Sequence, residues 1–128
     1  MSQVTLYHVE GFRSTRCLWM YLELQKVYGD RIPDLDLKTF DAETFRHSKP
    51  PEFLELNPNG KVPTLVHGDI VMWDSCAICL YLLDNFDLDR ILVPKDSAFR
   101  AKLYKLMFYL SGKYLARRIW SSLRLSNN

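Results

Sequence analysis

The chain has 128 residues, is 48% hydrophobic and carries a net charge of +2, so it can fill one ordinary core with an appendage but not two full domains, and its bulk charge does not indicate nucleic-acid binding. Three cysteines, an odd number without framework spacing, favour a reducing compartment over a secreted disulfide fold. Because the sequence shows neither a signal-peptide pattern nor a long apolar run, we expect a cytoplasmic protein without a membrane span.

The N-terminal stretch predicts a strand followed by a helix. Strand-forming residues fill positions 4–8, and Gly11 ends this run. Ser14 is a suitable N-cap for a helix over residues 15–27. The apolar residues of this helix predict a broad buried face: Leu18, Trp19, Tyr21, Leu22 and Leu24.

A second strand and a polar segment follow. Residues 32–37 alternate in part and contain Pro33, which an edge strand tolerates. Residues 38–50 are polar and predict a loop with a functional role. A short helical turn is expected at residues 51–56, where a proline suits the first helical position.

The middle of the chain predicts a hairpin and a helix. Two short apolar runs, 64–67 and 70–73, flank a Gly-Asp turn. The pair Asp74-Ser75 suits the start of a helix over residues 76–86, because small polar residues cap helices well. The order β-α-β-α-β-β-α predicts an α/β sandwich with a mixed four-stranded sheet.

The pattern changes after residue 86. We divide the chain into an α/β domain of residues 1–86, a linker of residues 87–96, and residues 97–128 as the start of a helical segment appended to that domain. Apolar residues recur there at three- and four-residue intervals: Leu103, Leu106, Met107, Leu110 and Tyr114. The tail is basic, and we expect its side chains to be solvated rather than bound to nucleic acid: Lys113, Arg117, Arg118 and Arg124, with Trp120.

One loop and one dipeptide carry a family resemblance. The sequence NPNGKVP at residues 57–63, the hairpin and Asp74-Ser75 resemble the glutathione-binding half of the glutathione transferase superfamily, over roughly residues 4–86. The resemblance implies a thioredoxin-like domain in which Val62, before a cis Pro63, pairs its backbone with the cysteinyl part of glutathione. It also implies that Asp74 and Ser75 hold the γ-glutamyl end. This end carries an ammonium, which an acid complements, and a carboxylate, which a hydroxyl at a helix N-terminus complements.

The thiol-activating position departs from the family pattern. The family places Ser, Tyr or Cys after the first strand, but Gly11 or Phe12 stands there and neither side chain can donate a hydrogen bond. Ser14 is the nearest replacement as the catalytic residue, with an ordinary N-cap as its equally supported alternative. Thr15 is a weaker candidate. Tyr7 is expected in the core, because alternation along the strand turns it to the other face.

The glycine carboxylate of glutathione needs a cation. Lys49, His47 and Lys61 lie in the loops where the resemblance places one, and Lys61 ranks first because it adjoins Val62. No His/Cys/Asp/Glu set has zinc spacing, so we expect no metal. Glutathione is therefore the expected co-substrate.

The Cys76-x-x-Cys79 motif leaves a thiol-redox interpretation open. Helix N-termini can lower a thiol pKa. Redox motifs of thioredoxin type open the first helix, however, whereas this one opens the helix after the hairpin. We favour packed, semi-apolar cysteines here, and also for Cys17.

Three functions follow from the resemblance. The first is a glutathione transferase that conjugates the glutathione thiolate to a small electrophile, as in detoxification. The second is a non-catalytic glutathione-binding or protein-assembly module, and the third is a glutathione-dependent thiol-disulfide oxidoreductase. The family's second domain has several helices and this chain contains one, so its catalytic competence stays open. The exposed apolar face expected on that helix predicts a homodimer.

Overall fold

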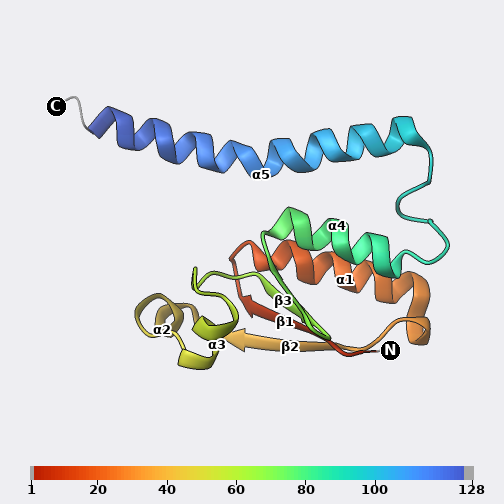
Figure 1. Cartoon of the computed structure of the whole chain (residues 1–128), viewed down its shortest axis with the longest axis horizontal. Helices are drawn as coiled ribbons and strands as arrows, with labels where there is room; N and C mark the ends of the chain where they lie inside the picture. The colour runs from red at the N-terminus through yellow and green to blue at the C-terminus, as the bar shows by residue number, and fades with distance from the viewer. Residues whose placement is uncertain (1, 126–128) are drawn as a thin grey trace. The chain divides into compact units, whose positions relative to one another are not determined.

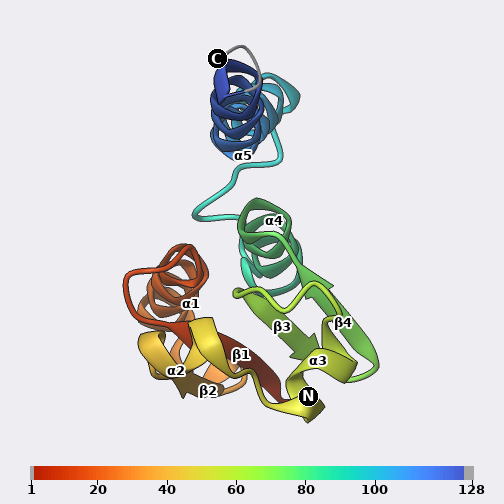
Figure 2. The same cartoon turned by 90° about the vertical axis from the view of Figure 1, so that its left-hand side faces the viewer.

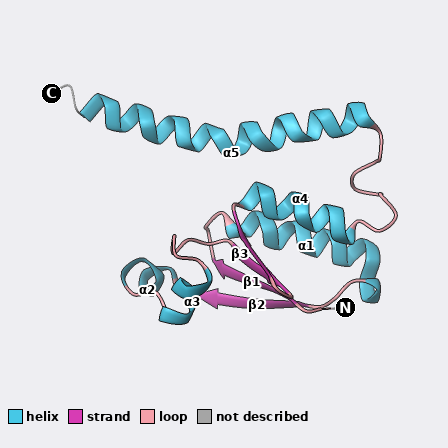
Figure 3. Ribbon diagram, in the orientation of Figure 1, coloured by secondary structure: helices cyan, strands magenta, loops and turns pink. Residues whose placement is uncertain are grey.

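The computed structural model describes the backbone of residues 2–125 and the side chains of residues 2–112. It contains two compact units, one ending at Asp89 and one beginning at Arg90. Figures 1 and 3 show the elements of the first unit, which follow in chain order: β1 (Val4–Val9), α1 (Ser14–Tyr28), a 3-10 turn (Gly29–Arg31), β2 (Leu35–Phe40), α2 (Ala42–His47), α3 (Pro51–Leu56), β3 (Thr64–His67), β4 (Ile70–Trp73) and α4 (Ser75–Phe86). The second unit contains α5 (Ser97–Leu125).

The four strands form one mixed sheet in the order β2-β1-β3-β4. β1 runs parallel to β2, while β1–β3 and β3–β4 pair antiparallel. This arrangement confirms the predicted thioredoxin-like class and places β2 at an edge, as the proline before it indicated. Tyr7 lies opposite Thr64 in the register, so the end of β1 lies beside the segment that leads into β3.

Helices α1 and α4 lie side by side against the sheet (Figure 2). Val4 and Leu6 of β1 are completely buried. Because side chains alternate along a strand, Tyr7 and Val9 lie on the opposite face from these two. There Val9 packs in a second cluster with Phe45 of α2 and with Phe53 of α3. Tyr7 is half-buried and packs against this cluster, with its ring centre 5.3 Å from that of Phe53, so the predicted packing of Tyr7 on this face is confirmed.

The buried stripe of α1 is narrower than predicted. Its completely buried side chains follow helical spacing and include Cys17, Tyr21 and Leu24. Trp19 and Leu22 are 67% and 52% exposed, so their predicted burial is wrong. The apolar pattern alone was too wide to define the contact face, because a helix turns only part of its circumference toward one partner.

Residues 38–50 do not form the predicted loop. β2 continues to Phe40, and α2 begins directly after Asp41, whose carboxylate accepts hydrogen bonds from the Thr44 N–H (2.9 Å) and hydroxyl (3.0 Å). These hydrogen bonds lower the pKa of Asp41. Phe40 and Phe45 stack at 5.3 Å within the second cluster. The packing of these two phenylalanines, five positions apart, therefore holds in the core a segment whose other residues are mostly polar.

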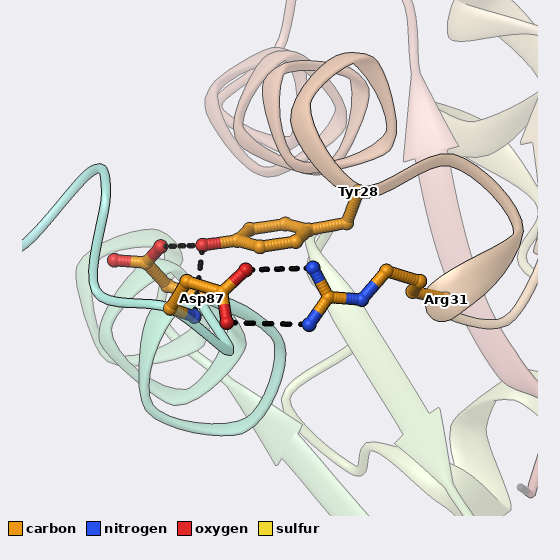
Figure 4. Close-up of polar contacts among 4 residues, drawn as sticks. Tyr28, Arg31 and Asp87 are labelled. Atoms are coloured by element: carbon orange, nitrogen blue, oxygen red, sulfur yellow. Dashed lines mark hydrogen bonds and ion pairs between the residues drawn. The ribbon is translucent and has the colours of Figure 1, made fainter.

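A polar clamp fixes the end of α4 against the end of α1 (Figure 4). We define it as Tyr28, Arg31, Asp87 and Asp89. The Tyr28 hydroxyl donates to the buried Asp87 carboxylate and accepts from the Asp89 N–H at 3.2 Å. The Arg31 guanidinium makes two bonds to the Asp89 carboxylate, at 2.6 and 3.2 Å.

The appended helix α5 begins where the sequence predicted it. Asp96 accepts a hydrogen bond from the Phe99 N–H at 2.7 Å, which satisfies one of the first amides of the helix. Large apolar side chains on α5 are 43–72% exposed: Phe99, Leu106, Phe108, Tyr109 and Leu110. The predicted solvation of the basic tail concerns side chains outside the described residues. Within the described residues, no helix combines the length and the hydropathy that crossing a membrane requires.

Candidate functional site

The segment before β3 is shaped by one buried amide. Asn57 is completely buried, and its Nδ2 donates to the Lys61 carbonyl (3.1 Å) and to the Thr64 hydroxyl (2.9 Å). Its Oδ1 accepts from the Asn59 N–H at 3.1 Å, and its carbonyl accepts from the Gly60 N–H at 2.8 Å. Gly60 has φ +60°, and an added Cβ there would meet side-chain carbons at about 3.0 Å. The loop therefore needs both an amide at position 57 and glycine at position 60.

The last residue of this loop before Pro63 is Val62, whose backbone groups are uncommitted. The Val62-Pro63 peptide bond is cis. The Val62 side chain packs in the second cluster with Val9, Phe45 and Phe53. Among the described residues, Val62 makes no backbone–backbone hydrogen bond. Its N–H and C=O are therefore available to an extended ligand, in the way that one strand pairs with another.

The start of α4 faces the same region. Asp74 is its N-cap, and the carboxylate Oδ1 accepts from the N–H groups of Cys76 and Ala77, both at 3.0 Å. The backbone of Asp74 has φ +77°, a region that non-glycine residues rarely adopt and that costs on the order of 1–3 kcal/mol. Such strain is concentrated at binding sites. Ser75, the first helical residue, is buried beside it.

A cleft of about 360 Å³ lies between the 57–63 loop and the start of α4. Its lining comes from the start of α1, the 57–63 loop and the β4–α4 junction: Arg13, Asn57, Asn59, Lys61, Val62, Pro63, Trp73, Asp74 and Ser75. The structure therefore brings together five of the predicted site residues: Lys61, Val62, Pro63, Asp74 and Ser75. Sequence reasoning gave no role to Asn57, although it lies in the NPNG motif, and it did not predict Arg13 as a lining residue. Trp73 was assigned to the hairpin alone.

Ser14 is held inside the protein and does not line the cleft. It is completely buried, and its Oγ lies 2.8 Å from the His8 Nδ1, 3.1 Å from the Val9 N–H and 3.2 Å from the Val9 carbonyl. α1 begins at Ser14 itself and its N-cap is Arg13, so the N-cap interpretation of Ser14 is wrong. The hydroxyl instead closes the turn between β1 and α1. Burial lowers the pKa of His8, so its imidazole is neutral near neutral pH.

Two further basic candidates lie outside the cleft lining. The Lys49 ammonium lies 4.9 Å from the centre of the Phe45 ring, in a cation–π contact, and its stem touches the loop at Gly60. His47 is exposed and contacts Glu43 one turn earlier, at 3.1 Å. Lys61 is the predicted lysine that the structure places in the cleft.

The cysteines pack between α1 and α4. The Cys17 thiol donates to the Ser75 carbonyl at 3.5 Å, and the Cys79 thiol donates to the Arg16 carbonyl at 3.8 Å. A hydrogen bond with Cys79 and burial raise the pKa of Cys17 far above its ordinary value, and burial raises the pKa of Cys76. All three cysteines are buried and free. The hydrogen bond with Cys17 lowers the pKa of Cys79. Burial of all three thiols nevertheless favours structural cysteines over redox-active ones, because reactive thiols are partly exposed.

The described residues contain no group of three or more His, Cys, Asp or Glu side chains placed to hold a metal ion.

The family model for the glutathione S-transferase N-terminal domain matches residues 14–85. The chain belongs to the glutathione S-transferase family. It is 35% identical over 115 residues to glutathione S-transferase 1 of Schizosaccharomyces pombe, covering 86% of this chain and 45% of that protein. It is 47% identical over 104 residues to glutathione S-transferase 1 of Dianthus caryophyllus, covering 81% and 45%. The chain thus spans about half the length of the curated relatives it matches.

Solved glutathione transferases share the fold of this chain. A delta-class glutathione transferase of Nilaparvata lugens superposes with a TM-score of 0.65 at 36% identity, covering 83% of this chain and 46% of that one. A glutathione S-transferase of the Antarctic clam Laternula elliptica gives a TM-score of 0.70 at 32% identity, covering 98% and 54%. A transferase homologue of Drosophila mojavensis, solved with bound glutathione, gives 0.67 at 28% identity, covering 88% and 48%.

Proposed function

We propose that this transferase chain binds glutathione in the cleft and presents its sulfur to a small electrophile. The observation that carries the proposal is the position of Val62, whose uncommitted backbone lies in one cleft with Asp74 and Ser75. Val62, beside Pro63, pairs with the cysteinyl residue, while Lys61 attracts the glycine carboxylate. Asp74 contacts the ammonium of the γ-glutamyl group, and Ser75 with the helix N-terminus contacts its carboxylate.

Glutathione acts as co-substrate in the proposed reaction. Its thiol loses a proton to solvent, and the thiolate sulfur forms a bond to an electrophilic carbon while a leaving group departs with its electron pair. This is the conjugation chemistry of detoxification. The family membership and the glutathione-bound homologue support it. Ser14 as the catalytic residue and Lys49 as a glutathione contact stay predictions, and their absence from the cleft lining does not favour them.

A non-catalytic glutathione-binding module is the second candidate. The observation that favours it is the lack of a side-chain donor at Gly11 and Phe12, together with the Ser14 hydroxyl being turned toward His8 and Val9. Thiol-disulfide exchange is less well supported, because burial keeps the Cys76 thiol protonated and the exchange reaction needs a thiolate.

Substitution of the helix-capping acid tests the binding site. We expect Asp74→Asn to weaken glutathione binding about tenfold to hundredfold, because it removes the charge opposite the γ-glutamyl ammonium. Asparagine caps helices as well as aspartate and tolerates positive φ, so folding should be retained. Isothermal titration calorimetry with glutathione measures the change.

The matched control is Asp41→Asn, which makes the same change at the N-cap of α2, outside the cleft. It should leave the affinity unchanged. Equal affinity of the Asp74→Asn and wild-type proteins would contradict the assigned site. Turnover of a chlorinated dinitrobenzene by the wild-type protein would support the enzyme, and binding without turnover would support the non-catalytic module.

We also propose a cytoplasmic homodimer. Support for the compartment comes from the three free thiols at positions 17, 76 and 79, which a reducing environment preserves. Support for self-association comes from the exposed apolar side chains of α5. The appended segment of residues 97–128 is proposed as the start of a helical domain, separated by residues 87–96 from the glutathione-binding domain of residues 1–86.

A further inference from the structure

The start of α1 contributes one charged side chain to the cleft. Arg13 lines it, whereas the neighbouring Ser14 hydroxyl is buried against β1. Among the described residues, the charged side chains that line this cleft are Arg13, Lys61 and Asp74. Asp74 and Lys61 have counterparts at the two ends of glutathione in the proposed function. Arg13 has no counterpart in that assignment, because each charged group at the ends of the tripeptide is already matched.

Two sets of contacts locate Arg13 between the proposed anchors. The Cys17 thiol bonds to the Ser75 carbonyl, so the first turn of α1 lies against the first turn of α4. On the other side, Val9 packs with Val62 in the second cluster, so the connection that leads from β1 to Arg13 starts beside the Val62 edge. The cysteinyl residue is the middle of the tripeptide. In the proposed function this residue pairs with Val62 between the Asp74 and Lys61 anchors, and the start of α1 lines the same cleft.

We infer that Arg13 is the catalytic cation of this site, contacting the sulfur of bound glutathione and stabilising its thiolate in place of the hydroxyl missing at Gly11 and Phe12. The inference rests on the proposed function and adds to it the identity of the activating group. A cation within about 4–6 Å of an acid favours the charged form and lowers its pKa by about 1–3 units. Asp74 acts in the opposite direction, and Lys61 in the same direction.

The test is a titration of the glutathione thiol on the protein, followed by the ultraviolet absorbance of the thiolate at saturating glutathione. We expect Arg13→Gln to raise the pKa of bound glutathione by about one unit or more, and Arg13→Lys to restore most of the difference. Lys26→Gln is the control, because it removes the same charge from the far end of α1, about 20 Å away, where salt screens its field. It should leave the thiol pKa unchanged.

Ser14→Ala separates the two candidates for thiol activation. A shift of the thiol pKa in Ser14→Ala without a shift in Arg13→Gln would overturn the inference and return the role to the serine. A measurement on the wild-type protein alone provides a second test, because salt screens the field of a partly exposed cation. Its contribution predicts that the pKa of bound glutathione rises with added sodium chloride, and a salt-independent pKa would contradict it.

The proposed function can fail separately from this inference. If the wild-type protein shows no calorimetric binding of glutathione, the binding site itself is wrong, and the inference fails with it. If glutathione binds with unchanged affinity in Lys26→Gln and its thiol pKa is the same in wild-type and Arg13→Gln proteins, the proposed function stands and Arg13 is not the activating group. Circular dichroism of each variant shows that the domain is folded.

Discussion

At the scale of single residues, the site combines predicted and unpredicted side chains for identifiable reasons. Val62, Asp74 and Ser75 were predicted because a motif and a helix start mark them in the sequence. Arg13 was not, because its place in the cleft depends on the packing of α1 against α4, which links residues far apart in sequence. Ser14 occupies the predicted position, but tertiary contacts direct its hydroxyl to β1.

The buried imidazole of His8 makes stability depend on pH. Burial lowers its pKa from 6.5 in the folded state, and nearby Glu10 opposes this only in part. Below pH 6.5 the unfolded chain therefore binds a proton before the folded chain does, so this contribution to stability is complete above pH 6.5 and is lost as the pH falls. We expect His8→Gln to lessen this loss, as measured by urea unfolding across the acidic range.

His47→Gln is the matched control, because it replaces an exposed imidazole in the same domain. The acid-side loss of stability should persist in this variant. An identical pH profile for His8→Gln and the wild-type protein would show that other groups govern the acid sensitivity.

At the scale of elements, local signals predicted most strand and helix limits well, but β2 lies three residues later than the predicted strand 32–37. The hairpin 64–67/70–73 and the helix 51–56 agree with the structure in every residue, because turn and proline signals fix both ends. Helix α2 was missed because its apolar content is low and its cap, Asp41, reads equally well as a loop residue. The exposure of Trp19 and Leu22 depends on tertiary contacts that apolar spacing does not record.

The clamp joining α1 to the end of α4 should contribute unequally through its two pairs. We expect Tyr28→Phe to lower the free energy of unfolding by about 1–3 kcal/mol, because it removes a donor from the buried Asp87 carboxylate. Arg31→Gln should lower the free energy of unfolding much less, and added salt should reduce its effect, because Arg31 and Asp89 are about half exposed. Chemical denaturation at low and high salt measures both.

Unfolding at low and high salt also shows which result would contradict this assignment of the clamp. If the Tyr28→Phe loss were as salt-sensitive as the Arg31→Gln loss, the phenol would be acting through the surface ion pair and not through the buried carboxylate.

At the scale of the whole molecule, the described residues of α5 leave several large apolar side chains exposed. Phe108 is 72% exposed. If Phe108 is buried in a symmetric dimer, both copies of the side chain contribute to the free energy of association. We therefore expect Phe108→Ser to weaken self-association at least about tenfold. Sedimentation equilibrium over a range of protein concentrations measures this.

Leu22→Ser on α1 is the control for this prediction, since it removes an exposed apolar side chain from the first unit. It should leave the dimer intact. A wild-type protein that stays monomeric at all concentrations would show that α5 is covered in another way.

The hydrogen bonds of Asn57 have a consequence for how fast and how tightly the cleft can capture a ligand. One side-chain amide organises the loop through hydrogen bonds within the protein itself, so a peptide that arrives meets a finished edge. Ordering a loop residue costs about 1–2 kcal/mol, and here that cost belongs to folding instead of to capture. A small molecule that makes few contacts therefore keeps more of its binding free energy in such a site.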